Sequence, residues 1–202
     1  MGHAGTLDPM ASGVLPMAVG KATKQIPKLP QEKEYIAEMY LGINTTTDDV
    51  EGEIIAQESA IQINRQIIEE VVEQKFTGKI LQKTPLFSAR HFQGQRLYKM
   101  ARKDKSPDLS EIPEKEVVIH EFEIVDFQSG EKAILKCRIR CSSGTYIRSL
   151  ARDMGNFLQV GGSLKSLIRT LAGGFKLENS YLIEQIEFKI INDPTAYGYF
   201  HC

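Results

Sequence analysis

Residues 135–141, LKCRIRC, alternate strictly between apolar and basic side chains. A period of two is that of a strand with one face against a core and the other in solvent. The apolar set is Leu135, Cys137, Ile139 and Cys141, and the basic set is Lys136, Arg138 and Arg140. The chain must therefore build a sheet around a strand at 132–142, and other elements must cover the apolar face of that sheet.

The other elements are predicted from weaker patterns. A strand at 117–127 is expected to pair with the first through a hairpin turn at Ser129-Gly130. Further strands are expected at 14–19, 35–41 and 53–57, helices at 21–29, 64–78, 95–103, 147–158 and 164–171, and a surface loop at 104–116. Because strands outnumber those of a parallel βαβ repeat, we predict an α+β domain with a mixed, largely antiparallel sheet and flanking helices.

Composition favours a globular protein of the cytoplasm. The 202 residues are 42% hydrophobic and 25% charged, without an apolar run long enough to span a bilayer. The first fifteen residues lack the basic start and apolar stretch of a signal peptide. Three cysteines without metal-ligand spacing indicate reduced thiols, so we expect a soluble, cytoplasmic protein.

The charges are sorted along the chain, although the net charge is only −1. Residues 83–105 carry seven basic side chains against one acid, and residues 132–169 carry eight against one. The balancing acids lie mainly at 48–73 and 104–126. This sorting favours a basic surface that suits a polyanion such as RNA, and solvated basic faces without a ligand are the alternative.

Several common catalytic motifs are excluded. The segment from Gly13 to Lys21 lacks the spacing of a phosphate-binding loop, and the four histidines lack the spacing of a metal site. No G-x-S-x-G motif is present, and no second acid lies near Asp8 to form a carboxylate pair. Asp8 is therefore an isolated carboxylate on a turn, where an Asp-Pro pair often has only a structural role.

The segment around Asp8 resembles a family signature. HAGTLDPMASGVLPMAVGKATK is similar to the pattern GHxGTLDPxAxGvLPxxxGxATK of the TruB family of tRNA pseudouridine synthases. The segments YIAEMYLGINTTTDDVEG, FTGKILQKTPLFSARHFQGQRLYKMAR, RCSSGTYIRSLARDMGNFL and SLKSLIRTLAGGF resemble later motifs of the family in the same order. The likeness extends from Gly2 to about Phe175, and it implies the pseudouridine synthase catalytic fold.

The resemblance implies an isomerase that converts a uridine in the T loop of tRNA, U55, to pseudouridine after the base leaves the RNA stack. It implies three catalytic residues: Asp8 as nucleophile, Arg148 beside it, and Tyr35 stacking on the flipped base. Attack on the ribose C1′ is the expected route, and addition to the uracil ring is the alternative. The T arm of tRNA is the implied partner, and no metal, organic cofactor, membrane or protein partner is implied.

The resemblance also assigns substrate contacts. His3 corresponds to the histidine that enters the RNA loop, Lys24 to the lysine of the ATK motif, and Tyr146 and Leu167 to residues that line the uracil pocket. The basic segments add candidates for RNA phosphates, namely Arg90, Arg96, Arg102, Arg138, Arg140 and Arg152. Each of these has an ordinary alternative as a core, turn or solvated residue.

The chain departs from the family pattern in three places. It begins at the catalytic motif, without the upstream KPxGxTS block, and Thr46 stands where the family usually has Asp. We expect a catalytic domain over residues 1–189 that is truncated at its N-terminus, and a tail over 190–202 too short for a PUA-type RNA-binding domain. A fragment with little catalysis that binds RNA or helps tRNA fold is the alternative function.

Overall fold

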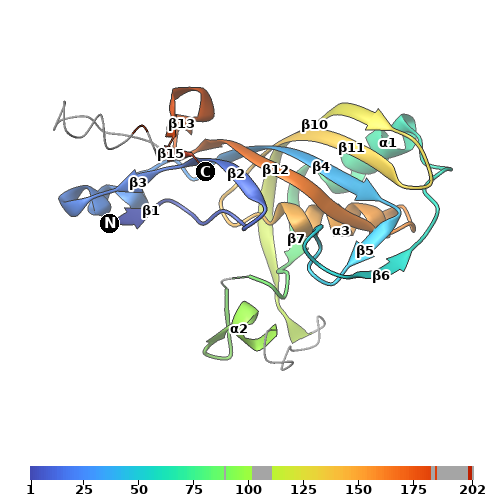
Figure 1. Cartoon of the computed structure of the whole chain (residues 1–202), viewed down its shortest axis with the longest axis horizontal. Helices are drawn as coiled ribbons and strands as arrows, with labels where there is room; N and C mark the ends of the chain where they lie inside the picture. The colour runs from blue at the N-terminus through green and yellow to red at the C-terminus, as the bar shows by residue number, and fades with distance from the viewer. Residues whose placement is uncertain (89, 102–110, 183–184, 186–199, 202) are drawn as a thin grey trace.

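The alternating segment forms strand β11 (Ala133–Cys141), and a computed structural model of the chain places it inside a nine-stranded sheet (Figure 1). The structure describes all residues except 89, 102–110, 183–184, 186–199 and 202. Within that part, the strands of the sheet follow the order β14-β15-β2-β12-β4-β11-β10-β7, and β13 pairs with β12. The remaining bounds are β2 (Ala11–Leu15), β4 (Lys33–Leu41), β7 (Gly78–Lys83), β10 (Glu114–Gln128), β12 (Gly162–Ala172), β13 (Phe175–Lys176), β14 (Tyr181–Leu182) and β15 (Phe200–His201).

The pairing confirms a mixed, largely antiparallel sheet. β11 runs antiparallel to both β10 and β4, as the hairpin at 117–142 predicted. Two pairs are parallel, β12 with β2 and β14 with β15. Two residues of the predicted tail, Phe200–His201, pair with β2 and thereby join this sheet.

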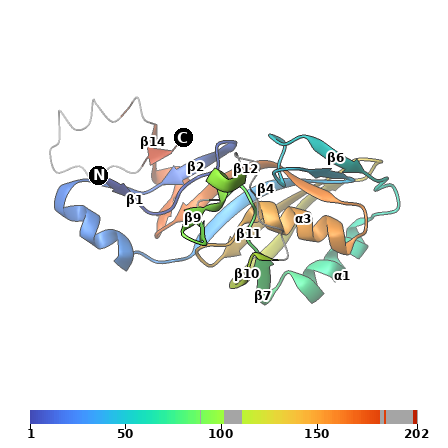
Figure 2. The same cartoon turned by 90° about the horizontal axis from the view of Figure 1, so that it is seen from below.

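Two helices cover one face of the sheet, α1 (Arg65–Lys75) and α3 (Ile147–Phe157) (Figure 2). Asn64 begins α1 as predicted, because its side chain accepts a hydrogen bond from the amide of Ile67. Buried residues of both helices form one apolar cluster with alternate residues of β4 and β11. This cluster contains Ile68, Val72, Leu150 and Met154 from the helices and Tyr35, Ala37, Met39, Leu135 and Ile139 from the strands.

The predicted helix at 164–171 is wrong, because these residues belong to β12. The register of β12 against β4 shifts twice, between Leu164 and Ser166 and again between Arg169 and Leu171. Each shift inserts an extra residue, so the positions that face the core change parity. A helix is predicted because the apolar residues Leu164, Leu167, Ile168 and Leu171 recur at helical spacing. Only Leu164 and Leu167 of these are buried, and the next buried positions are 169 and 172.

Other boundaries differ less. Helix α2 (Leu97–Ala101) is shorter than expected, because Gln95–Arg96 form strand β9, which pairs with β8 (His91–Phe92). Gly78, expected to end a helix, instead begins β7, and β7 pairs with residues 114–119 of β10. Residues 114–116 were therefore wrongly expected in a loop, and 104–110 of that loop lie outside the described residues.

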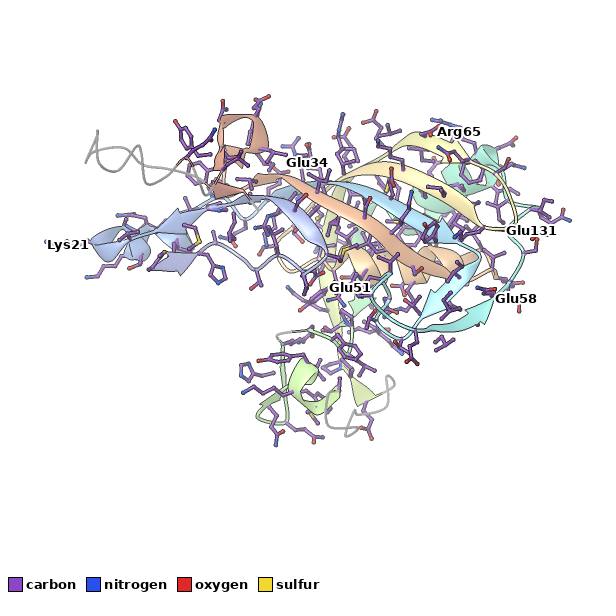
Figure 3. The ribbon with its side chains drawn as sticks, in the orientation of Figure 1. Lys21, Glu34, Glu51, Glu58, Arg65 and Glu131 are labelled. Carbon is purple, nitrogen blue, oxygen red and sulfur yellow. The ribbon has the colours of Figure 1, made fainter. Side chains whose placement is uncertain are left out.

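Short elements complete the chain. They are β1 (Gly2–His3), β3 (Met17–Ala18), the 3-10 helix η1 (Gly20–Lys28), β5 (Ile43–Thr45), β6 (Ile54–Gln57) and the 3-10 helix η3 (Leu177–Asn179). The segment with Lys21 projects from one end of the molecule, whereas Glu58 and Glu131 lie at the other end (Figure 3). Among the described residues, no helix is long and apolar enough to cross a membrane.

Candidate active site

Asp8 lies between β1 and β2, and Arg148 is the second residue of α3. The guanidinium of Arg148 holds the Asp8 carboxylate through two hydrogen bonds, with Nε donating to Oδ2 at 2.9 Å and Nη2 donating to Oδ1 at 3.1 Å. The Arg148 side chain is 3% exposed and the Asp8 side chain 32% exposed. A bidentate pair of this kind fixes the orientation of the carboxylate while one side of it stays open to solvent.

Arg148 is itself held by three further groups. Its Nη1 donates to the Thr47 carbonyl at 3.1 Å, and its Nη2 donates to the Phe87 carbonyl at 2.9 Å. The buried carboxylate of Asp49 lies 3.5 Å from Nη1. A guanidinium with all these acceptors has one allowed orientation, so the position of Asp8 is fixed as well.

Asp49 is oriented by its own loop, between β5 and β6. Its Oδ1 accepts hydrogen bonds from the Thr47 hydroxyl at 2.6 Å and from the Glu51 amide at 3.0 Å. Thr46, the departure from the family pattern, accepts from the amide of Glu53 at 3.1 Å. Thr46 therefore closes the β5–β6 hairpin and makes no hydrogen bond to Arg148.

Tyr35 on β4 is buried beside the site and opposite Arg169 of β12. Burial raises the pKa of Tyr35 to about 12, and the nearby Arg169 guanidinium offsets part of this increase. The phenol is therefore protonated at neutral pH, and it can donate a hydrogen bond or present its ring to a base.

Sequence reasoning missed the structural role of Arg169, which is fully buried. Its Nε donates to the Val14 carbonyl at 2.8 Å, Nη1 to the Thr6 carbonyl at 3.2 Å, and Nη2 to the Gly5 carbonyl at 3.1 Å. These bonds tie the segment that carries Asp8 to the centre of the sheet. A single arginine inside the apolar run 167–171 was the signal, because a charged residue there must be paired or hydrogen-bonded.

Two further predicted residues lie close to this cluster. Leu167 is buried in β12, where it pairs with Ala11 of β2 and Ala37 of β4. Tyr146 directly precedes α3, two residues before Arg148. The Gln82 side chain accepts a hydrogen bond from the Tyr146 amide at 2.8 Å and donates one to the Tyr146 carbonyl at 3.0 Å. The structure thus brings Asp8, Tyr35 and Arg148 together with both residues expected to line a uracil pocket.

The predicted RNA-contacting cations are more scattered. His3 and Lys24 are exposed on the N-terminal segment. Arg90 donates to the Thr84 hydroxyl, and Arg152 pairs with Asp48 at 3.0 Å and with Asp153 at 2.9 Å. Burial raises the pKa of Asp48, an effect that Arg152 partly offsets. The Arg96 side chain and the whole of Arg102 lie outside what the structure describes.

Arg138 and Arg140 lie on the sheet face opposite the helices, away from Asp8. Arg138 pairs with Glu123 at 2.9 Å, and Arg140 pairs with Glu32 at 2.7 Å. Within the described part of the chain, no group of His, Cys, Asp and Glu is arranged to hold a metal ion. The site itself combines one carboxylate in a fixed orientation, one guanidinium and one phenol that is protonated at neutral pH.

Comparison with known proteins gives a family match. A family profile described as "TruB family pseudouridylate synthase (N terminal domain)" matches residues 1–147. The tRNA pseudouridine synthase B of Acaryochloris marina is 44% identical over 186 residues, which are 92% of this chain and 63% of the relative. That of Francisella tularensis subsp. holarctica is 46% identical over 188 residues, or 92% and 60%. The chain thus spans less than two thirds of either curated relative.

Solved structures give the same fold. A chain in a crystal structure of a Cbf5-Nop10-Gar1 complex matches with a TM-score of 0.66 and 27% identity, over 96% of this chain and 48% of that one. A chain in an H/ACA RNP bound to a substrate RNA containing 2'-deoxyuridine matches with a TM-score of 0.63 and 26% identity, over 96% and 47%.

Proposed function

This chain belongs to the TruB family of pseudouridylate synthases, and from this membership we propose that it converts a uridine of tRNA to pseudouridine. The single observation that carries the proposal is the Asp8–Arg148 pair. A carboxylate that is held in one orientation and is one third exposed is suited to nucleophilic attack on an incoming nucleotide.

In the proposed reaction, Asp8 attacks the flipped nucleotide and releases uracil from its N-glycosidic bond. Attack on the ribose C1′ is favoured, and addition to the uracil ring is the alternative. With attack at C1′, the C1′–N1 bond breaks as an ester bond forms between Asp8 and C1′. The bound base rotates, and its C5 then attacks C1′, which breaks the ester bond and restores the Asp8 carboxylate. C5 loses its proton and N1 takes up a proton. Because atoms are only rearranged, the overall conversion needs no oxidant, reductant or energy source.

Side chains around Asp8 support binding of a base out of its stack. Tyr35 supplies a flat ring and a neutral hydroxyl, and Leu167 and Tyr146 supply apolar surface nearby. Exposed His3 is suited to fill the gap that the flipped base leaves in the RNA loop. Lys24 is exposed on the same N-terminal segment, where it can reach an RNA phosphate.

The finer assignment is the T loop of tRNA, at U55, in the cytoplasm. The names of the curated relatives support a tRNA substrate, and the free thiols of Cys137 and Cys141 suit a reducing compartment. Predicted phosphate contacts of Arg90, Arg96 and Arg152 belong to this proposal. The proposal for Arg138 and Arg140 has weaker support, because both side chains are paired with glutamates on the sheet face away from Asp8.

The experiment is to mix the chain with a tRNA T-arm RNA that carries tritium at C5 of its uridines. Forming the new C5–C1′ bond removes the hydrogen on C5, so each turnover releases tritium to water. A matched RNA with cytidine at the target position controls for the site of modification.

We expect tritium release from the uridine RNA and none above background from the cytidine RNA. Binding of both RNAs without release would overturn the proposal and favour the alternative, an RNA-binding or tRNA-folding module. Equal release from both RNAs would contradict the assignment of the target uridine.

A further inference from the structure

Two cations near Asp8, Lys33 and Arg169, have no carboxylate partner among the described residues. Arg169 is fully buried, and its guanidinium donates to three backbone carbonyls. Lys33 is half-buried on β4, and no described salt bridge reaches its ammonium. Burial lowers the pKa of Lys33, and the charges of Arg169 and Lys115 lower it further. A half-buried cation next to a fully buried one is costly unless a negative group completes the site.

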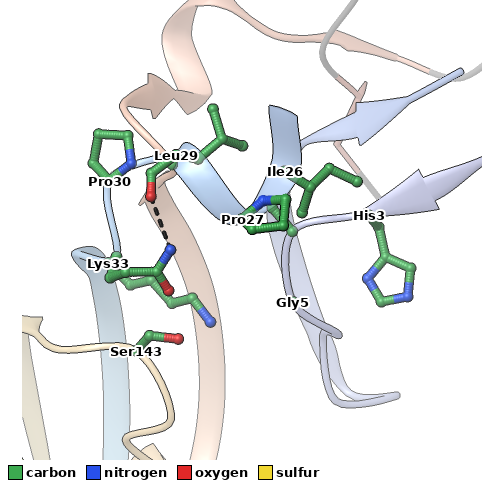
Figure 4. Close-up of a pocket in the computed structure, with 11 residues that line it drawn as sticks. His3, Gly5, Ile26, Pro27, Leu29, Pro30, Lys33 and Ser143 are labelled. Atoms are coloured by element: carbon green, nitrogen blue, oxygen red, sulfur yellow. Dashed lines mark hydrogen bonds between the residues drawn. The ribbon is translucent and has the colours of Figure 1, made fainter. Parts of the chain in front are cut away.

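A pocket of about 190 Å³ opens at the Lys33 ammonium (Figure 4). Its walls include His3, Gly5, Pro27, Pro30 and Ser143. Figure 4 shows Lys33 Nζ extended toward Gly5, with the Ser143 hydroxyl below it. None of the residues that line the pocket is acidic. Because one water fills about 30 Å³, the pocket has room for a phosphate group and several waters.

The backbone at Gly5 runs close to this ammonium. Gly5 has φ +99°, and a Cβ at this position would lie 2.7 Å from Lys33 Nζ. The positive φ favours glycine here, and the absence of a Cβ leaves space for the lysine end beside the segment that leads to Asp8. On the opposite rim, Lys115 Nζ donates to the Ser143 carbonyl at 3.4 Å, which adds a third positive charge.

The pocket is next to the catalytic cluster. Lys33 and Tyr35 are two residues apart on β4, so their side chains share the helix-covered face about 7 Å apart along the strand. Gly5 precedes Asp8 by three residues, and Arg169 contacts both Gly5 and Tyr35. A nucleotide whose base rests on Tyr35 therefore has its own backbone within reach of the Lys33 ammonium.

We propose that the pocket formed by His3, Gly5, Lys33 and Ser143 is a phosphate site that binds the RNA backbone next to the nucleotide that reacts at Asp8. This inference rests on the proposed function for the identity of the RNA. Lys33 supplies the charge, and the Ser143 hydroxyl and the His3 ring supply further hydrogen-bonding groups. The bound phosphate gives Lys33 the negative partner that it lacks among the described residues.

The test compares Lys33→Gln, Lys33→Arg and a matched control, Lys79→Gln. Lys79 pairs with Glu116 on the distant strand β7, so its loss removes one charge away from the pocket. All three changes are made in an Asp8→Asn background, so that the RNA is bound without being converted. The affinity for T-arm RNA is measured over a series of salt concentrations, and thermal unfolding checks that each variant is folded.

We expect Lys33→Gln to weaken RNA binding about tenfold and to reduce the slope of log affinity against log salt by about 0.7 to 0.9. Lys33→Arg should keep most of the slope, and Lys79→Gln should match the parent. Lys33→Gln should unfold no earlier than the parent, because it removes a half-buried charge that has no carboxylate partner among the described residues. If Lys33 had only a structural role, Lys33→Gln would unfold at a lower temperature than the parent.

A second measurement needs no variant and no RNA. Inorganic phosphate added at constant ionic strength should shift the amide NMR signals of Gly5 and Ser143 in the parent chain. Unmoved signals, or an unchanged salt slope in Lys33→Gln, would overturn the phosphate site. Failure of the proposed function would be a separate result. It would appear in the tritium experiment, where the parent chain with Asp8 would bind RNA without releasing tritium.

Discussion

Two arginine–carboxylate pairs of this protein have the same chemistry and opposite surroundings. Arg148 and Asp8 meet at 2.9 Å on the helix-covered face of the sheet, with side chains 3% and 32% exposed. Arg138 and Glu123 also meet at 2.9 Å, on the opposite face, with side chains 46% and 47% exposed. The distance between the charges is equal, so the difference between the pairs lies in burial.

Burial changes what each pair can do. Water screens Arg138 and Glu123, and both are free to change rotamer, so such pairs contribute about 0 to 1 kcal/mol. Arg148 cannot turn away, because Thr47, Phe87 and Asp49 also hold it. The buried pair therefore works as a fixed part of the site, whereas the exposed pair only balances charge on the surface.

The largest expected effect is that of Arg148→Gln. It leaves Asp49 buried without a cation and Asp8 without orientation. We expect turnover on T-arm RNA to fall by about 10²- to 10³-fold and the free energy of unfolding to fall by about 3 to 5 kcal/mol. Tritium release and urea unfolding measure the two quantities.

Arg138→Gln is the matched control for that change. It should alter the free energy of unfolding by no more than about 1 kcal/mol and leave turnover unchanged. Equal losses from both variants would show that burial does not distinguish the two pairs.

The next largest effect is on stability, and it is tested by replacing two cations of strand β12, Arg169 and Lys165. Arg169→Met leaves three backbone carbonyls without their donor, and the buried one, that of Val14, costs about 1 to 3 kcal/mol when it is unsatisfied. Lys165→Met removes a pair with Glu38, in which both side chains are about 30% exposed, and a contact of the ammonium with the Tyr40 ring at 5.6 Å. We therefore expect Arg169→Met to lower the urea midpoint clearly and Lys165→Met to change it little. The reverse order would contradict the role of Arg169 in holding the Asp8 segment.

A smaller effect is the dependence of stability on pH, which tests whether Tyr35 is buried on the helix-covered face. Tyr35 ionises at about 12 in the folded protein and near 10 when unfolded. Between these values the unfolded state binds fewer protons, so stability is intact below pH 10 and falls as the pH rises toward 12. Ultraviolet titration should show a tyrosine ionising near 12 that is absent in Tyr35→Phe. Full ionisation of all tyrosines near 10 would show that Tyr35 is not buried.

The smallest effect concerns RNA on the opposite face. Because Arg138 and Arg140 are paired with glutamates there, the double change to Gln should weaken T-arm RNA binding less than about threefold. A filter-binding or anisotropy titration gives the affinity. A tenfold loss would show that RNA also covers this face.

Sequence alone could predict the strands whose side chains alternate and the helix that Asn64 caps. It could not predict β12, because the apolar residues at 164, 167, 168 and 171 recur at helical spacing, and two bulges break the alternation of the buried positions. Asp8 and Arg148 are 140 residues apart, so only the family resemblance joined them before the structure did. Arg169 and Lys33 were missed, because their roles depend on which strands lie side by side.

The most direct test of the account is the single-turnover rate of Asp8→Asn, with the RNA affinity measured on the same samples. Asp126→Asn, on the exposed part of β10, controls for the loss of one carboxylate. We predict that Asp8→Asn gives no detectable product and keeps its RNA affinity within about threefold of the parent. Asp126→Asn should match the parent in the single-turnover rate and in the RNA affinity. Product formation by Asp8→Asn at the parental rate would contradict the central claim that this one carboxylate is the nucleophile.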